Sequence, residues 1–274
     1  MAEKNSRPNL WTERGGTGKP TLLLLHGLGA NATVWEGLLP IVERRWPGRW
    51  VAPDLRGHGR SSAAAPYGFA THAADIAAAL EQDEEVVAVG HSMGGAVAMT
   101  LASGWFGLRV RAVVAFGVKL VWTEEEVRKA RELSRAPTRW FQTRDEAVER
   151  YLRVSGLYGL VDPASPSVAV GVVEEHGRYR LAADPRINGV VGPPIEKVVA
   201  AMGAPLRLAA GERDPMVTLE QMQRYDPDAA VIEGVGHNPH LEAPDRLWRV
   251  IEAAITPQIR DSEESRETVR DRRG

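Results

Sequence analysis

Short apolar runs recur along the first 120 residues and again after residue 200, and each run ends at a turn of small or polar residues. Such runs are typical of strands that are buried on both faces of a parallel sheet. The predicted strands are residues 21–25, 50–53, 86–89, 112–116, 206–210 and 230–233. Alanine-rich helical patterns at 76–80 and 96–102 predict crossover helices. The alternation predicts an α/β fold with a mostly parallel central sheet flanked by helices.

One interval interrupts this alternation. Residues 117–205 separate two predicted strands and are far more than one crossover connection requires. Two capping boxes, Thr123 with Glu126 and Thr143 with Glu146, predict helix starts within the interval. We therefore predict a mainly helical cap at residues 118–192, inserted between strands and lying over one face of the sheet. The alternative is a long connection with no role in a site.

The remaining chain divides around this cap. Residues 1–117 are predicted to form the first part of a core domain, and residues 193–256 its second part. Residues 257–274 are rich in charge and contain few large apolar side chains, so we expect a charged, disordered tail.

Composition narrows the class of protein. The 274 residues suffice for a substantial core without disulfides or metals. Lys plus Arg (34) nearly balance Asp plus Glu (36), so no basic field indicates a nucleic-acid partner. The absence of cysteine excludes a disulfide framework and a cysteine nucleophile. Residues 1–8 lack a signal-peptide core, and no apolar run approaches the roughly 20 residues that span a bilayer. We expect a cytoplasmic protein that binds no membrane; its oligomeric state stays open.

A serine follows the third predicted strand in the stretch "VVAVGHSMGGA", residues 86–96. Gly-x-Ser-x-Gly after a buried strand predicts a turn so tight that side chains at Gly90 and Gly94 would clash. Ser92 would then present its hydroxyl at the carboxyl end of the strand. The N–H of Met93, at the start of the next helix, would point to where negative charge develops on a substrate.

A second apolar run ends in a similar turn, "LLLLHGLGA", residues 22–30. Its glycines let the backbone curl so that the N–H of Leu28 faces the same oxyanion. His26 is a possible base, but a histidine that ends a buried strand is more often structural.

Two further polar side chains follow later strands. Asp214 lies in "RLAAGERDPMV" and His237 in "AVIEGVGHNPHLEAPD". The carboxyl ends of parallel strands gather catalytic groups in open α/β sheets. A serine nucleophile requires a base and a group that orients the base. The chain order Ser92, Asp214, His237 is the order of α/β-hydrolases.

The chain resembles the α/β-hydrolase superfamily over residues 10–255, on the stretches "HGLG", "PDLRGHGRS", "GHSMGG", "GERD" and "GHNPHLEAPD". The resemblance implies a serine esterase-like enzyme with Ser92 as nucleophile, His237 as base and acid, and Asp214 as orienter. Leu28 and Met93 would supply the oxyanion-hole N–H groups. The turn of Asp54, Arg56, Gly57 and His58 is expected to be structural. His237 is preferred over His240 because an acidic residue, Glu242, follows it by five positions.

The expected activity is hydrolysis of a small or medium-sized carboxylic ester, or a related thioester or lactone. A carboxylate nucleophile, as in epoxide hydrolases and haloalkane dehalogenases, is excluded by the serine. Carbon–carbon bond hydrolysis and perhydrolysis on the same triad remain as alternatives. A hydrolase-fold ligand-binding or receptor protein with little turnover is the alternative from another class. No cofactor is required, and no residues have metal-ligand spacing.

Aromatic side chains are the candidates for the substrate pocket. Trp35, Trp122, Trp140 and Tyr158 are proposed to bind substrate, with Phe141 and Tyr151 as further wall residues. Trp35 and Trp105 are expected on the core side. Each can equally pack the cap onto the sheet.

Overall fold

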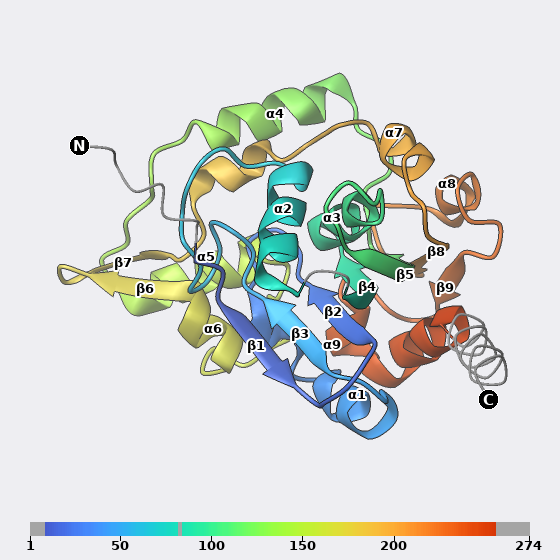
Figure 1. Ribbon diagram of the computed structural model, residues 1–274. Coiled ribbons are helices and arrows are strands. Elements are labelled where there is room, and N and C mark those ends of the chain that lie inside the picture. Colours follow the sequence, from blue (N-terminus) through green and yellow to red (C-terminus); the bar gives the residue numbers. More distant parts are fainter. Residues whose placement is uncertain (1–8, 82–83, 256–274) are drawn as a thin grey trace, which may run out of the picture.

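The computed structural model describes residues 9–81 and 84–255, and its centre is a seven-stranded sheet (Figure 1). The strand order is β1-β3-β2-β4-β5-β8-β9. β1 pairs with β3 in the antiparallel direction, and the other neighbours pair in parallel. The strands are β1 Thr12–Gly15, β2 Thr21–Leu25, β3 Trp50–Pro53, β4 Glu85–His91, β5 Arg109–Phe116, β8 Leu206–Gly211 and β9 Ala230–Ile232.

The predicted fold class is confirmed, and all six predicted strands are present. β4 and β5 begin earlier than their apolar runs because Glu85 and Arg109 extend the parallel pairing. The edge strand β1 was not predicted. Its sequence, TERG, carries no apolar signal, and its conformation depends on pairing with β3 far along the chain.

Helices cover both faces of the sheet (Figure 1). Successive side chains of β2 point to opposite faces, so Leu22 and Leu24 belong to one hydrophobic core and Leu23 and Leu25 to the other. The first core is covered by α1 (Leu39–Arg45) and the helical residues 244–255. The second is covered by α2 (Phe69–Ala79), α3 (Met93–Leu101), α7 (Ile195–Ala200) and α8 (Leu219–Gln223).

The long interval between β5 and β8, for which a cap is predicted and which we call the cap, contains more helix than strand. It contains α4 Glu124–Ser134, α5 Arg144–Val154, α6 Pro166–Gly171, β6 Val172–Glu175, β7 Arg178–Leu181 and the 3₁₀ segment η2 Pro185–Gly189. Both predicted capping boxes form at α4 and α5. The β6–β7 hairpin was not predicted, since its residues are largely charged and only half-buried. The division into core and cap domains stays a prediction.

Buried hydrogen bonds attach the cap to the core. The Nδ2 group of Asn31, which caps the 3₁₀ segment η1 (Ala32–Trp35), donates to Tyr151 Oη at 2.9 Å and to the Ser167 carbonyl at 2.9 Å. On another side, the Tyr67 hydroxyl donates to Asp184 Oδ2 at 2.8 Å. These bonds fix α5, α6 and the start of η2 against the loops that follow β2 and β3.

The predicted tail at 257–274 lies outside the described residues. Within 9–81 and 84–255, no helix combines the length and apolarity that a membrane crossing requires.

Candidate active site

Ser92 occupies a strained turn between β4 and α3. Its φ of 51° and ψ of −117° lie where non-glycine residues are rarely found. Such a backbone costs about 1–3 kcal/mol and persists only when its surroundings impose it. A Cβ at Gly90 would collide with the Gly94 carbonyl, and one at Gly94 with the Leu25 carbonyl. The two glycines therefore allow β2, β4 and α3 to approach closely enough to hold Ser92 in this turn.

Asp214 and His237 lie side by side in the loops that follow β8 and β9. His237 Nδ1 lies 2.9 Å from Asp214 Oδ2 and 3.0 Å from Oδ1. The aspartate side chain is fully buried, and its Oδ1 also accepts from the Met216 N–H at 2.8 Å. This arrangement assigns the proton to Nδ1, so Nε2 of the neutral ring is free to accept a proton. The histidine side chain is 23% exposed, which leaves it accessible to a ligand.

Glu242, at the end of α9 (Pro239–Glu242), holds the backbone on both sides of His237. Its Oε2 accepts from the Gly236 N–H at 2.8 Å, and its Oε1 accepts from the Asn238 N–H at 3.1 Å. The Asn238 side chain donates to the Gly156 carbonyl of the cap at 2.9 Å. The acidic residue five positions after His237 therefore has a physical task, which is to fix the loop that carries the imidazole.

The serine and the histidine–aspartate pair meet at the carboxyl edge of β4 and β5. The Ser92 N–H donates to the Phe116 carbonyl at 2.8 Å. A Cβ at the next residue, Gly117, would lie 3.1 Å from both Asp214 Oδ2 and His237 Cε1, and its φ is +63°. His91 Nε2 lies 2.9 Å from the His237 carbonyl. Among the described residues, no hydrogen bond joins Ser92 Oγ to His237.

The two predicted oxyanion donors border a cavity that also contains Ser92. Leu28 and Met93 line this cavity of about 100 Å³, which we call the serine cavity. Neither of their N–H groups donates to a backbone carbonyl in the turns, loops and caps of the described chain. Met93 is the first residue of α3, so the partial positive charge of the helix N-terminus adds to its N–H. Leu28 and Met93 thus border the same cavity as Ser92, as the predicted oxyanion hole requires.

The structure separates the predicted aromatic wall residues. Trp122 lines the serine cavity, and Phe141 lines a larger cavity in the cap. Trp140 packs beneath Arg178 and Arg180 and lines neither cavity.

Four other aromatic candidates line neither of these two cavities. Trp35 is completely buried against Phe116 and His240, which removes it from the candidate pocket wall. Tyr151 is also buried, in the attachment of the cap. Tyr158 is 56% exposed beneath Arg153, and Trp105 is 74% exposed. Aromatic type alone cannot separate these positions, because Trp fills cores and covers surfaces as readily as it lines pockets.

The other wall residues of the serine cavity were missed by sequence reasoning. They are Phe69, Ala96, Val118, Lys119, Val190, Val191, Pro193, Ile195 and Met216. Most are apolar, and together they come from five separate segments, so no local motif identifies them. Lys119 forms an ion pair with Glu126 at 2.7 Å, which lowers the pKa of that exposed carboxyl to about 2.

The remaining histidines near the site are buried and structural. His26 Nε2 accepts from the Leu55 N–H at 2.9 Å, and burial lowers the pKa of His26. Burial also lowers the pKa of His240 to about 3, with a further contribution from His237. His91 stacks on Phe116, and burial holds its pKa well below the ordinary value. The lowered pKa values make these three rings weaker bases than an ordinary histidine and keep them neutral near pH 7.

The turn around Asp54 is structural as well. The carboxylate is fully buried and accepts from the Ala32 N–H at 2.7 Å and from the Arg60 N–H and Nε at 2.8 and 2.7 Å. Burial raises its pKa, but these hydrogen bonds outweigh burial and hold the pKa below its ordinary value. The described residues contain no group of three or more metal-ligating side chains in a suitable arrangement.

Comparisons with known proteins agree with this architecture. A sequence model described as the alpha/beta hydrolase family matches residues 22–250. Lipase LipV of Mycobacterium tuberculosis (strain ATCC 25618 / H37Rv) is 33% identical over 176 residues, which are 60% of this chain and 62% of LipV. The chain thus spans less than two thirds of that relative.

Two further proteins match over most of their length. The magnesium-chelatase 30 kDa subunit of Rhodobacter capsulatus is 29% identical over 263 residues, covering 87% of this chain and 88% of the subunit. The crystal structure of E-2-(acetamidomethylene)succinate hydrolase has a TM-score of 0.75 at 22% identity and covers 91% of this chain and 96% of its own. The structural likeness supports the fold.

Proposed function

The chain belongs to the alpha/beta hydrolase family, and from this premise we propose that it is a serine hydrolase that cleaves a small or medium-sized carboxylic ester. The observation that carries the proposal is the Asp214–His237 pair at the same sheet edge as the strained Ser92. The similarity to a protein named as a lipase, LipV, adds support for ester chemistry.

The first half of the proposed reaction forms an acyl-enzyme. Ser92 Oγ attacks the ester carbonyl while His237 Nε2 takes the hydroxyl proton. Asp214 accepts the Nδ1 proton in a hydrogen bond and stabilises the imidazolium that forms. The ring then gives the proton from Nε2 to the leaving alcohol, and the C–O bond of the ester breaks.

Water completes the cycle. His237 Nε2 removes a proton from water as the water oxygen attacks the acyl carbonyl, and the proton then returns to Ser92 Oγ as the acid leaves. During both halves the N–H groups of Leu28 and Met93 stabilise the oxyanion. Each such donor contributes about 3 kcal/mol to the transition state.

The hydrogen bond between Ser92 Oγ and His237 Nε2, which the reaction requires, is part of this proposal. Catalytic hydrogen bonds in unliganded enzymes are often absent and form with bound substrate. The neutral states of His91 and His240 favour the scheme, because a nearby positive charge would disfavour imidazolium formation on His237. The cap, residues 118–192, is proposed to roof the site as a separate domain over the core formed by 1–117 and 193–256.

The experiment is steady-state hydrolysis of short aryl esters by three proteins: the wild type, Ser92→Ala and Ser103→Ala. Ser103 follows the opposite end of α3, and within the described part of the chain its Oγ accepts one local bond, from the Trp105 N–H, so it serves as a matched control. We expect turnover by the wild type and the control, and loss of at least about 10³-fold in Ser92→Ala. Equal rates for wild type and Ser92→Ala would refute the proposal.

A second candidate is a ligand-binding protein with little turnover. The observation that favours it is the match over 88% of a protein named as a magnesium-chelatase subunit, a name that indicates no ester chemistry. Wild-type protein that binds esters without hydrolysing them would support this second candidate.

A further inference from the structure

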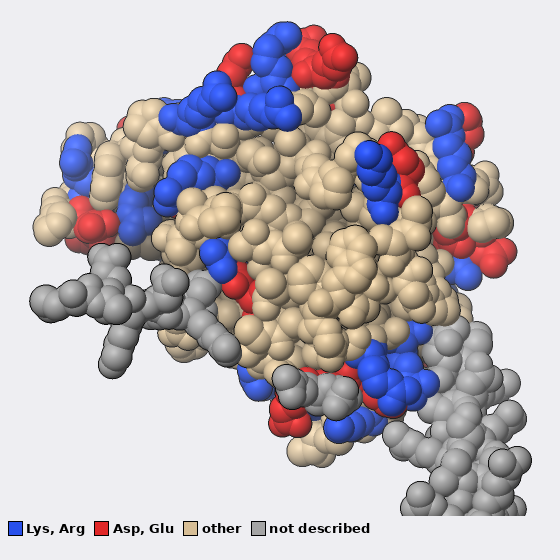
Figure 2. Space-filling model, turned by 45° about the horizontal axis from the view of Figure 1, so that its top comes forward, with Lys and Arg blue, Asp and Glu red and all other residues tan. Residues whose placement is uncertain are grey.

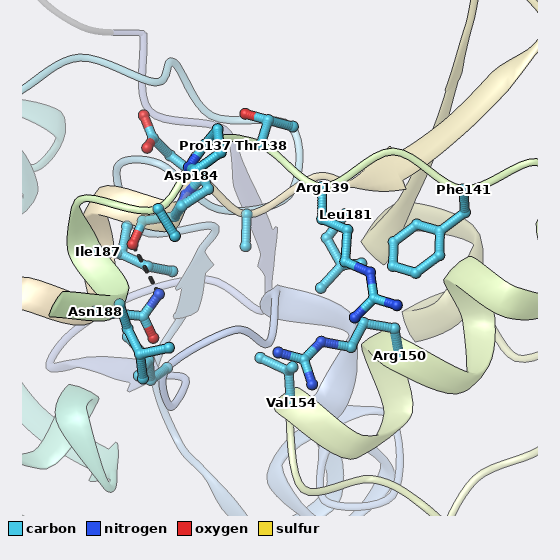
Figure 3. A pocket seen from close by; sticks show the side chains of 15 residues that line it. Pro137, Thr138, Arg139, Phe141, Arg150, Val154, Leu181, Asp184, Ile187 and Asn188 are labelled. Atoms are coloured by element: carbon cyan, nitrogen blue, oxygen red, sulfur yellow. Dashed lines mark hydrogen bonds between the residues drawn. The ribbon is translucent and has the colours of Figure 1, made fainter. Parts of the chain in front are cut away.

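A second cavity, which we call the cap cavity, lies beside the oxyanion turn and contains two arginines. Its volume is about 340 Å³, more than three times that of the serine cavity. Its apolar walls include Pro137, Phe141, Leu181 and Ile187. Figure 3 shows Arg139 and Arg150 reaching from two elements into the same half of this space, with Val154 next to them.

Arg139 and Arg150 belong to the half of the cap's twelve Lys and Arg side chains that have no carboxylate partner among the described residues. Six other basic residues of the cap form ion pairs: Lys119–Glu126, Arg128–Glu132, Lys129–Glu125, Arg153–Glu149, Arg180–Glu175 and Arg186–Asp184. Arg139 instead lies over the Phe141 ring at 4.9 Å. Figure 2 shows several Lys and Arg side chains at the top and upper left of this face, with Asp and Glu side chains near them and further charged side chains along its right and lower edges.

The acidic residue of the cap cavity does not neutralise the two arginines. Asp184 lines the cavity, but its carboxylate is occupied by Arg186 at 2.6 Å and by the Tyr67 hydroxyl at 2.8 Å. Arg139 and Arg150 are exposed residues at the margin of a cavity whose remaining wall is largely apolar, so a ligand in the cavity can reach their N–H groups. Guanidinium groups form their strongest hydrogen bonds with carboxylates and phosphates.

The cap cavity and the serine cavity share one wall residue. Leu28, whose N–H is proposed to hold the oxyanion, lines both the cap cavity and the serine cavity. Val154 packs onto the same turn, since a Cβ at Gly29 would lie 3.2 Å from Val154 Cγ1. Arg150 lies four residues earlier on α5 and hence about 6 Å along the helix from Val154. Leu28, Val154 and Arg150 thus lie in sequence from the serine cavity to the arginine end of the cap cavity, which is the route the inference assigns to the acyl chain.

We propose that Arg139 and Arg150 bind a carboxylate at the far end of the acyl chain, so that the preferred substrate is a small-alcohol monoester of a dicarboxylic acid. The inference rests on the proposed ester hydrolysis. The longer, acidic acyl chain occupies the cap cavity, and the small alcohol occupies the serine cavity. Apolar side chains such as Leu181 and Phe141 contact the methylene groups between the two ends.

The test compares three methyl esters of similar length with different terminal charge: monomethyl adipate, methyl hexanoate and methyl 6-aminohexanoate. We expect kcat/KM for monomethyl adipate to exceed that for methyl hexanoate by about tenfold or more, and the amine to be the poorest substrate. In Arg139→Gln/Arg150→Gln the preference for the anion should disappear while hydrolysis of methyl hexanoate persists.

Arg144→Gln is the matched control for loss of a positive charge. Arg144 is exposed, begins the same helix as Arg150, and does not line the cap cavity. This control should retain the preference. An equal loss in Arg144→Gln, or an unchanged preference in the double variant, would overturn the inference.

A binding measurement separates failure of this inference from failure of the proposed function. Isothermal titration of Ser92→Ala with monomethyl adipate and with methyl hexanoate needs no turnover. Tighter binding of the anion that is lost in Ser92→Ala/Arg139→Gln/Arg150→Gln supports the carboxylate site even if the wild type hydrolyses no ester. Equal affinity for the two esters overturns the carboxylate site whether or not the wild type is an esterase.

Discussion

Replacing Glu242 by glutamine tests whether the loop around His237 must be held for activity. The two carboxylate oxygens accept from the N–H groups of Gly236 and Asn238, which flank the histidine. Glutamine keeps one acceptor oxygen and turns an NH₂ group towards the other N–H. One charge-assisted hydrogen bond is lost, and one partly buried N–H loses its acceptor.

The magnitude follows from that loss. A hydrogen bond to a charged group contributes about 1.5–3 kcal/mol. If the whole of this free energy is lost from the transition state, because the loop no longer holds His237 in place, kcat/KM falls by about 10- to 100-fold. Each 1.36 kcal/mol corresponds to a factor of ten in rate. The melting temperature should fall by a few degrees, at about 2–4 °C for each kcal/mol in a chain of this size.

The assay is aryl-ester hydrolysis together with thermal unfolding, and Glu212→Gln is the control. Glu212 Oε2 accepts from the Gly234 N–H at 2.8 Å, two residues before Gly236, but the side chain is exposed and does not flank His237. We expect Glu212→Gln to keep kcat/KM within about twofold of wild type. A Glu242→Gln enzyme with a lower melting temperature and an unchanged kcat/KM would refute the reasoning, since the loop would then need no clamp for catalysis.

Three further predictions concern stability. Tyr151→Phe should lower the free energy of unfolding by about 1–2 kcal/mol in denaturant titrations, because Asn31 Nδ2 loses one buried partner; no change would show that this bond does not hold the cap. Gly94→Ala should prevent folding, as judged by circular dichroism, because the alanine Cβ would collide with the Leu25 carbonyl. A folded and active variant would contradict the close packing of this turn. Burial lowers the pKa of His72 to about 4. Below pH 6.5 the unfolded chain therefore binds a proton at this histidine that the folded chain does not bind, so the free energy of unfolding falls as the pH drops from 6.5 towards 4. In His72→Leu the loss of unfolding free energy between pH 7 and pH 4 should be smaller than in the wild type, by at most about 3 kcal/mol. An unchanged pH dependence of stability would show that His72 is not neutral in the folded protein.

The sheet could be predicted because its signal is local. Buried parallel strands are continuous apolar runs, and the tight turn at Ser92 needs glycine at fixed positions. The edge strand β1 and the β6–β7 hairpin carry no such signal, since their conformation comes from pairing with distant residues. The capping boxes at Thr123 and Thr143 were predictable for the same reason as the turn, because each is complete within four residues.

The candidate site divides in the same way. Ser92, Asp214 and His237 each follow a recognisable strand, so topology alone brings them to one edge of the sheet. The cavity walls are different, because residues 118–122 and 190–195 meet only in the folded chain. Trp35 shows what the sequence could not predict. It lies close in sequence to the turn that carries Leu28, but nothing in the sequence indicated that its ring is buried in the core.

The most direct measurement of the central claim is the site of covalent labelling by a fluorophosphonate, read by intact-protein and peptide mass spectrometry. A fluorophosphonate reacts with a serine that is activated by a base and an oxyanion hole. The account predicts one phosphonyl group per chain, on the peptide that contains Ser92, and no labelling of Ser92→Ala. Labelling that persists in Ser92→Ala, or maps to another residue, would contradict the assignment of Ser92 as the nucleophile.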